Sequence, residues 1–181
     1  RDPAGNLNFQ AMLNWNDVKR IRDKFDIPLI LKGINTGEDA AIAVDHGIDV
    51  IYVSNHGGRQ LDQGRGTIEL LKECLAEVNG RAKIAVDGGF YRGTDILKAI
   101  ALGADIVGIG RLEAWAMAAG GQPAVVRMLE ILRNEMLLGM ALTGVTSLDE
   151  LDASFLAESQ PVVPPSVISA FPLLDVDDEG Y

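Results

Sequence analysis

The sequence predicts an α/β fold with a parallel sheet, and three observations support that prediction. Apolar segments alternate with helix-like segments four times between residues 14 and 140. The apolar segments are short and almost continuously apolar, as expected for strands buried on both faces of a sheet. An internal repeat also relates two strand–helix–strand units with a constant offset of 56 residues. Its matched pairs are Gly33 and Gly89, Gly37 and Gly93, Asp39 and Asp95, Gly47 and Gly103, and Asp49 and Asp105.

Local start and stop signals place the elements of the first part of the chain. A polar loop comes first, and a helix then extends from Asn14 to about Phe25, because Asn is favoured at the N-cap position. We expect this helix to bury Val18, Ile21 and Trp15. The next elements are a strand at Ile27–Leu31, a helix from about Glu38 to His46, and a strand at Asp49–Val53.

The second part of the chain continues the alternation. Thr67 and Thr94 are expected to cap helices that end near Gly80 and Gly103, because a hydroxyl oxygen can accept a helix N–H bond. The strands here are Lys83–Val86 and Asp105–Ile109, and a long helical region to about Met140 follows them, with a break at Gly120–Gly121 and Pro123 in the first turn after the break. A short helix capped by Ser147 and an irregular tail over residues 159–181 complete the chain.

Composition disfavours several classes of protein. The chain has 181 residues, is 48% hydrophobic and carries a net charge of −10, which argues against nucleic acid or an anionic membrane as a partner. Its single cysteine, Cys74, cannot form an internal disulfide and lies on the inward face of a helix, so we expect a cytoplasmic protein. No apolar run reaches membrane-spanning length, and no metal-ligand spacing is present, so we expect no metal.

A doubly wound sheet and a TIM barrel both satisfy this alternation. The carboxyl ends of the strands favour the barrel, because that is where TIM barrels carry their active sites. All four ends carry polar or glycine residues: Lys32, Ser54 with His56, Asp87 with two glycines, and Gly110 with Arg111. Four strands are half of the eight that a closed barrel needs. No G-x-G-x-x-G pattern follows a first strand, which disfavours a Rossmann nucleotide site.

The loop after the second strand contains the strongest candidate for an active site. His56 can exchange a proton near neutral pH, and Arg59 can hold a carboxylate through two parallel hydrogen bonds. The glycines between these residues allow close approach of a ligand. The structural alternative is a polar loop that closes a strand. His46, at a helix end, is interpreted as structural.

The last two strand ends are candidates for a phosphate site. Barrels commonly bind phosphate there, with glycine N–H groups and helix N-termini. Asp87 could hold sugar hydroxyls, and Arg92 and Arg111 could each hold phosphate. Lys32 could stabilise a developing anion, or it could be a solvated lysine after a strand.

These residues resemble a known family. Five motifs occur here in the same order as in the FMN-dependent 2-hydroxy acid oxidases and dehydrogenases, which include glycolate oxidase, lactate oxidase, mandelate dehydrogenase and flavocytochrome-type lactate dehydrogenase. The motifs are Leu31–Ile34, residues 53–62 (VSNHGGRQLD), Asp87–Gly89, Arg92–Asp95 and Ile109–Arg111. The resemblance covers about Asn14–Leu156 and implies a TIM barrel, of which residues 1–158 look like the second half, strands five to eight.

The resemblance implies a role for each motif. His56 matches the family's active-site base, which removes a proton as an (S)-2-hydroxy acid such as lactate, glycolate or mandelate becomes the 2-oxo acid. Arg59 matches the arginine that binds the substrate carboxylate, and Lys32 matches the lysine that stabilises reduced flavin. The remaining matches are contacts to FMN: Ser54, Asp87, Gly88, Gly89, Gly110 and Arg111.

Two departures from the family pattern accompany these matches. Tyr91 stands where the family usually has an arginine that contacts the FMN phosphate, and Arg92 could substitute for that arginine. The first half of the barrel is absent, and the chain opens at Arg1 rather than Met, so we expect it to be the later part of a longer protein. The expected partners are that N-terminal half, the substrate, and further copies in a homotetramer. The alternatives are another FMN barrel, such as an isoprenyl-diphosphate isomerase, and a non-catalytic half-barrel module.

Overall fold

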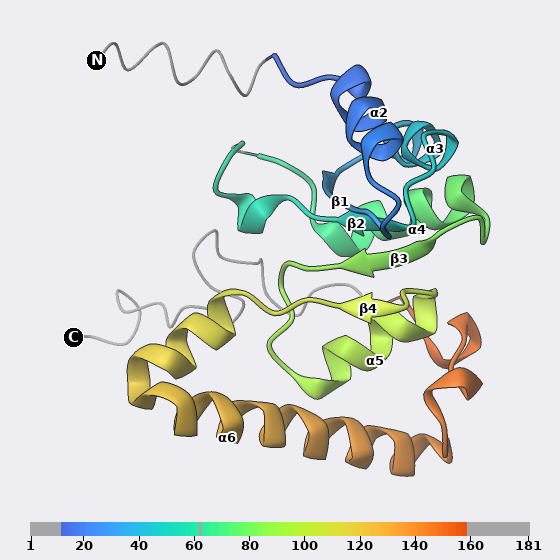
Figure 1. Cartoon of the computed structure of the whole chain (residues 1–181). Coiled ribbons are helices and arrows are strands. Elements are labelled where there is room, and N and C mark those ends of the chain that lie inside the picture. Colours follow the sequence, from blue (N-terminus) through green and yellow to red (C-terminus); the bar gives the residue numbers. More distant parts are fainter. Residues whose placement is uncertain (1–11, 62, 159–181) are drawn as a thin grey trace. The chain divides into compact units, whose positions relative to one another are not determined.

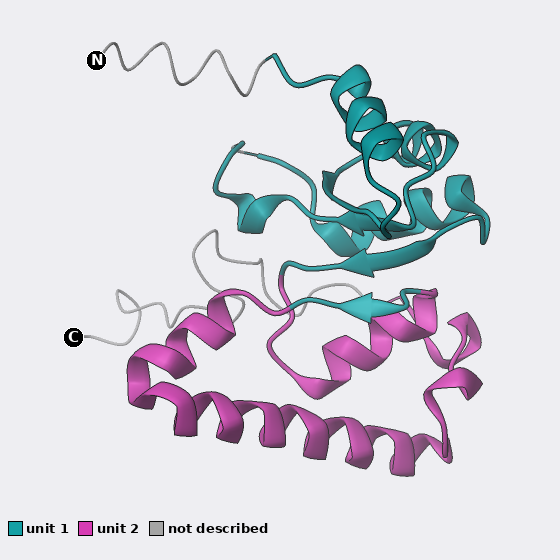
Figure 2. Cartoon of the chain, viewed as in Figure 1, with its two compact units in different colours: residues 1–88, 104–108 teal, residues 89–103, 109–181 magenta. Residues whose placement is uncertain are grey.

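The computed structural model describes residues 12–61 and 63–158 (Figure 1). The described chain divides into two compact units, which are considered separately (Figure 2): residues up to 88 with 104–108, and residues 89–103 with those from 109 onward. The predicted tail over 159–181 lies outside the described residues. The elements are α2 (Trp15–Lys24), β1 (Ile30–Ile34), α3 (Gly37–Asp45), β2 (Val50–Val53), η1 (His56–Gly58), α4 (Thr67–Val78), β3 (Lys83–Val86), α5 (Gly93–Leu102), β4 (Ile106–Val107), α6 (Arg111–Thr143), η2 (Leu148–Glu150) and η3 (Ala153–Phe155).

Unit 1 contains a four-stranded parallel sheet with the order β1-β2-β3-β4. Helices α3 and α4 pack against each other and against β2. Ile51 and Val53 of β2 are completely buried, as is Cys74 of α4. Burial raises the pKa of the Cys74 thiol to about 11, which keeps it protonated at neutral pH. The prediction that Cys74 belongs to the core is confirmed.

Strand β1 begins three residues later than the sequence indicated. Pro28 has no N–H, and the N–H of Leu29 donates instead to the carboxylate of Asp49 at 2.8 Å, so the backbone ladder starts at Ile30. The strand also ends later than predicted, at Ile34, so Lys32 lies within the strand rather than after it. The pairing of β1 with β2 shifts register between Lys32 and Ile34, where Gly33 has a φ of +101°.

Three further local predictions were wrong. Helix α2 has no buried residue, and Ile21 is 44% exposed. The predicted caps Thr67 and Thr94 both lie inside their helices, after N-caps at Gly66 and Arg92. The Thr67 hydroxyl donates to the carbonyl of Gly88 instead, at 3.2 Å. The last strand is also shorter than predicted.

The internal repeat has a structural counterpart at the starts of α3 and α5. In unit 1 the N–H of Gly37 donates to Glu73, whose carboxylate is held by Arg65. In unit 2 the N–H of Gly93 donates to Glu135 at 2.7 Å. Glu135 is in turn paired with Arg92 at 2.6 Å. In each unit a glutamate from the following helix thus occupies a helix N-terminus.

Unit 2 is built from α5 and the long helix α6. Helix α6 is broken at Gly120 and Gly121, as predicted, because both residues leave the helical φ/ψ region. Gly93 and Gly139 let α5 and α6 approach closely, since a Cβ on Gly93 would lie 2.5 Å from the carbonyl oxygen of Leu132. None of the described helices combines the length and apolar character needed to cross a membrane.

Candidate active site

Three polar side chains meet at the carboxyl ends of the strands in unit 1. The Lys32 ammonium donates to Ser54 Oγ at 2.8 Å and lies 3.2 Å from Asp87 Oδ2. Ser54 is fully buried, and its hydroxyl also accepts the N–H of His56 at 3.2 Å. One hydroxyl therefore connects the predicted flavin lysine to the start of the predicted catalytic loop. Three strands supply this cluster, or the residues directly after them.

His56 lies in a turn of unusual backbone conformation. Its φ is +53°, and Gly57 and Gly58 follow with φ values of +71° and +72°. A positive φ is costly for a residue with a side chain, and such residues are concentrated at functional sites. Asn55 supports the turn by accepting the N–H of Gly57 at 3.0 Å. The turn places the imidazole over Gly33, where a Cβ would lie 3.1 Å from His56 Cε1.

Arg59 follows this turn directly. It is exposed, and its guanidinium forms no hydrogen bond or ion pair with the described part of the chain. An unengaged guanidinium on the loop that carries a potential base is chemically suited to bind a carboxylate. The structure therefore brings His56 and Arg59 into one short segment beside Lys32.

The residues after β3 fit a ligand that carries hydroxyl groups. Asp87 Oδ1 is buried and has no hydrogen-bond partner, which leaves a carboxylate oxygen able to accept a ligand hydroxyl. Gly88 has a φ of +97°, and a Cβ there would lie 2.9 Å from Thr67 Oγ1. A side chain at Gly88 would therefore collide with Thr67. These features fit the ribityl chain of FMN, which is a chain of hydroxyl groups.

Unit 2 contains the other predicted cofactor residues. Gly89 and Gly110 both border open space, because a Cβ on either would meet nothing within 4 Å. Arg111 is the exposed first residue of α6, and its guanidinium has no partner among the described residues. A free arginine at a helix N-terminus is suited to a phosphate group.

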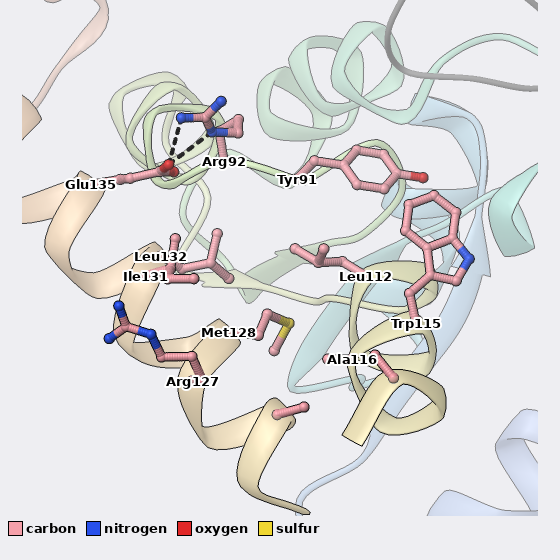
Figure 3. Close-up of a pocket in the computed structure, with 12 residues that line it drawn as sticks. Tyr91, Arg92, Leu112, Trp115, Ala116, Arg127, Met128, Ile131, Leu132 and Glu135 are labelled. Carbon is pink, nitrogen blue, oxygen red and sulfur yellow. Dashed lines mark hydrogen bonds and ion pairs between the residues drawn. The ribbon is translucent and has the colours of Figure 1, made fainter. Parts of the chain in front are cut away.

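Arg92 is already engaged. Its Nε donates to Glu135 at 2.9 Å (Figure 3). The same carboxylate accepts the N–H of Gly93. The Arg92 hydrogen bond, followed by that of Gly93, lowers the pKa of the Glu135 carboxyl below its usual value. The arrangement supports a structural role for Arg92 at the start of α5 rather than a role in phosphate binding.

Tyr91 lies at a mostly apolar cavity of about 500 Å³ within unit 2. Its ring stacks on Trp115 at a centroid distance of 5.5 Å, on the side of the cavity away from the ion pair of Arg92 and Glu135 (Figure 3). The aliphatic wall is formed by Leu112, Met128, Ile131 and Leu132. A role of Tyr91 in cofactor binding stays a prediction.

Sequence reasoning missed Tyr52 and Glu135. Tyr52 lies in an apolar strand and was assigned no role from the sequence, although its ring is 5.1 Å from the Lys32 ammonium. Glu135 lies in a long helix, 43 residues from Arg92. The internal repeat matches Gly93 to Gly37. It could therefore have indicated Glu135 only if Glu73 had already been known to accept the N–H of Gly37. No group of three His, Cys, Asp or Glu side chains suited to a metal occurs within residues 12–61 and 63–158.

Comparison with known proteins identifies the family. The model of the FMN-dependent dehydrogenase family matches residues 4–158. The chain is 47% identical to an L-lactate oxidase from Nostoc sp. over 80% of its own length and 40% of that protein. It is 44% identical to a 2-hydroxyacid oxidase from Dictyostelium discoideum, over 80% of the chain and 37% of the relative.

Solved structures agree with these sequence relatives. The crystal structure of a mandelate oxidase with (S)-2-phenylpropionate matches with a TM-score of 0.73 and 47% identity, over 76% of this chain and 41% of that one. Another mandelate oxidase structure, a variant with a C4a-OH-FMN adduct, matches equally well. The chain spans about two fifths of the length of these relatives. Its four parallel strands are part of a TIM barrel, as predicted. The chain belongs to the FMN-dependent dehydrogenase family.

Proposed function

We propose that the protein containing this chain uses FMN to oxidise a small (S)-2-hydroxy acid, such as lactate, glycolate or mandelate, to the 2-oxo acid. The observation that carries the proposal is the connected cluster at the strand ends, where Ser54 joins Lys32 to the His56 turn. The family match and the named activities of the relatives support the same reaction class.

Each residue of the cluster has a distinct task in this proposal. Arg59 holds the substrate carboxylate, and an imidazole nitrogen of His56 accepts the proton that the hydroxy acid loses. Bound FMN supplies the two-electron acceptor. The Lys32 ammonium provides fixed positive charge where negative charge develops, and Ser54 and Asp87 hold it in place.

The cofactor contacts of this proposal follow the family resemblance, residue by residue. Asp87 offers its buried Oδ1 to a ribityl hydroxyl, and the backbone of Gly88 lies next to it in the chain. Arg111 binds the phosphate with the N–H groups at the start of α6 and the backbone of Gly89 and Gly110. Arg92 takes no part in phosphate binding, because Glu135 holds it.

The outer strands of unit 1 point to a further partner. Ile30 on β1 is 60% exposed and Ile106 on β4 is 48% exposed, although both strands belong to a parallel sheet of the kind that is normally covered. We propose that the other half of the barrel pairs with these strands and completes the active site. A homotetramer and a cytoplasmic location stay predictions.

Steady-state oxidation of L-lactate, glycolate and L-mandelate by the full-length protein tests the reaction class. The assay uses an artificial dye acceptor in one series and dioxygen in the other, so that it also separates a dehydrogenase from an oxidase. Turnover of at least one hydroxy acid is the expected result. Bound FMN without oxidation of any 2-hydroxy acid, but with isomerisation of an isoprenyl diphosphate, would instead support the alternative barrel enzyme.

A further inference from the structure

Tyr52 lies on the sheet face opposite α3 and α4. Its strand neighbours Ile51 and Val53 are completely buried, and successive side chains of a strand point to opposite faces. Lys32 on β1 and Ala85 on β3 are its register partners. The Lys32 ammonium is 5.1 Å from the centre of the Tyr52 ring, within the range of a cation–π contact. The ring therefore supports the lysine from one side.

The hydroxyl end of Tyr52 reaches Gly108, just after β4. A Cβ on Gly108 would overlap the Tyr52 hydroxyl and would lie 3.1 Å from the Cβ of Asp87. The φ of Gly108 is outside the left-handed region, so the backbone itself would accept alanine. Glycine is needed here for space. The small side chain of Ala85 likewise leaves room for a ring that extends across β3.

The Tyr52 phenol also interacts with Asp87. Burial raises the pKa of the phenol, and the negative charge of the nearby Asp87 carboxylate raises it further. The phenol is therefore neutral at pH 7 and able to donate. Asp87 Oδ2 lies 3.2 Å from the Lys32 ammonium, while Oδ1 is buried without a partner.

We propose that Tyr52 is a positioning residue that holds the Asp87 carboxylate with its hydroxyl and supports Lys32 with its ring, in space provided by Gly108. In this arrangement Asp87 gives one oxygen to Lys32 and keeps Oδ1 for a ligand hydroxyl. The assignment of that ligand as the ribityl chain of FMN rests on the proposed function. Without the phenol, Asp87 is free to rotate and to give both oxygens to Lys32.

The first test measures phenol ionisation in the flavin-free chain by absorbance at alkaline pH. The chain has three tyrosines, so the Tyr52→Phe variant identifies the signal of Tyr52. In the wild type this signal is expected at higher pH than an ordinary phenol. In Asp87→Asn it is expected to move to lower pH, because the negative charge is gone. An unchanged signal in Asp87→Asn would overturn the proposed contact.

A double-mutant cycle tests the space at Gly108. Gly108→Ala is expected to lower the melting temperature, because the new methyl group collides with the Tyr52 hydroxyl. Adding Tyr52→Phe removes that hydroxyl and leaves only the tight contacts to the ring carbon Cζ at 3.2 Å and to Asp87 Cβ at 3.1 Å. Gly108→Ala is therefore expected to lower the melting temperature much less in the Tyr52→Phe background than in the wild type. Additive losses in the double variant would contradict the proposed fit.

Flavin binding tests whether Tyr52 positions Asp87 to bind the ribityl chain. Riboflavin carries the ribityl chain, whereas lumiflavin has the same ring system without it. Tyr52→Phe is expected to weaken riboflavin binding about tenfold, the value of one hydrogen bond to a charged group, and to leave lumiflavin unchanged. Equal weakening of both flavins would overturn the positioning role. If the wild-type protein binds neither flavin, the proposed function fails, and the phenol titration still decides whether Tyr52 holds Asp87.

Discussion

Replacing Glu135 by glutamine tests the ion pair that starts α5. The Glu135 carboxylate accepts two hydrogen bonds at 2.7 and 2.9 Å, from Gly93 and Arg92. Arg92 is 58% exposed, so solvent screens the charge and the ion pair contributes only weakly to stability. The backbone bond at the helix N-terminus contributes about 1 kcal/mol. Because the glutamine oxygen can still accept one bond, we expect a loss of about 1 kcal/mol, or roughly 2–4 °C in melting temperature.

The pH dependence of this loss of stability distinguishes the contribution of the Glu135 charge from that of the side chain's shape. The folded-state pKa of Glu135 is lowered by Arg92 and then by the Gly93 N–H, so its stabilisation is present above the unfolded pKa of about 4.3. It is lost as the pH falls through the lower folded pKa. The difference in the free energy of unfolding between wild type and Glu135→Gln should therefore be largest at pH 7 and decrease below about pH 4.

Urea unfolding of both proteins across this pH range measures the effect. Glu130→Gln is the matched control, because Glu130 lies on the same helix in an exposed pair with Arg127 and is expected to change stability by less than about 0.5 kcal/mol. An equal loss of stability in the two variants would contradict a specific role of Glu135 at the start of α5. So would a loss in Glu135→Gln that does not depend on pH.

The other predictions concern the proposed chemistry. His56→Ala should lower the turnover number roughly 10²–10⁴-fold while FMN stays bound, as shown by stopped-flow kinetics and the flavin spectrum; normal turnover would remove His56 as the base. Arg59→Lys should raise KM for the hydroxy acid more than it weakens FMN binding, because a point charge replaces a two-pronged donor; an unchanged KM would argue against carboxylate binding. Arg111→Ala should weaken FMN about tenfold and riboflavin little, since riboflavin has no phosphate, whereas Arg92→Ala should lower stability instead; equal effects of Arg111→Ala on both flavins would exclude a phosphate contact.

The parts of the fold that depend on local chemistry were predictable. The break of α6 at Gly120 and Gly121 follows from the freedom of glycine, and Pro123 is compatible with the first turn after that break. The start of β1 was not predictable, because it depends on a hydrogen bond from Leu29 to Asp49, 20 residues away. The later end of β1, at Ile34, changes the position of Lys32 from the loop to the strand.

The candidate site shows the same division between local and long-range information. The loop from Ser54 to Arg59 could be identified because its polar residues are adjacent in the sequence. Tyr52 could not, since its neighbours Lys32, Asp87 and Gly108 come from three other strands or the residues after them. The role of Arg92 was also undecidable from the sequence, because Glu135 competes for its guanidinium from a distant helix.

The most direct test of FMN-dependent 2-hydroxy acid oxidation is an anaerobic visible spectrum of the full-length protein. The spectrum is recorded before and after addition of L-lactate, glycolate or L-mandelate. We predict an oxidised flavin band that at least one of these acids bleaches in the wild type, and that the same acid leaves unbleached in His56→Ala. A bound flavin that no 2-hydroxy acid reduces would contradict the proposed reaction. Absence of flavin from the full-length protein would contradict the cofactor assignment and favour the non-catalytic module.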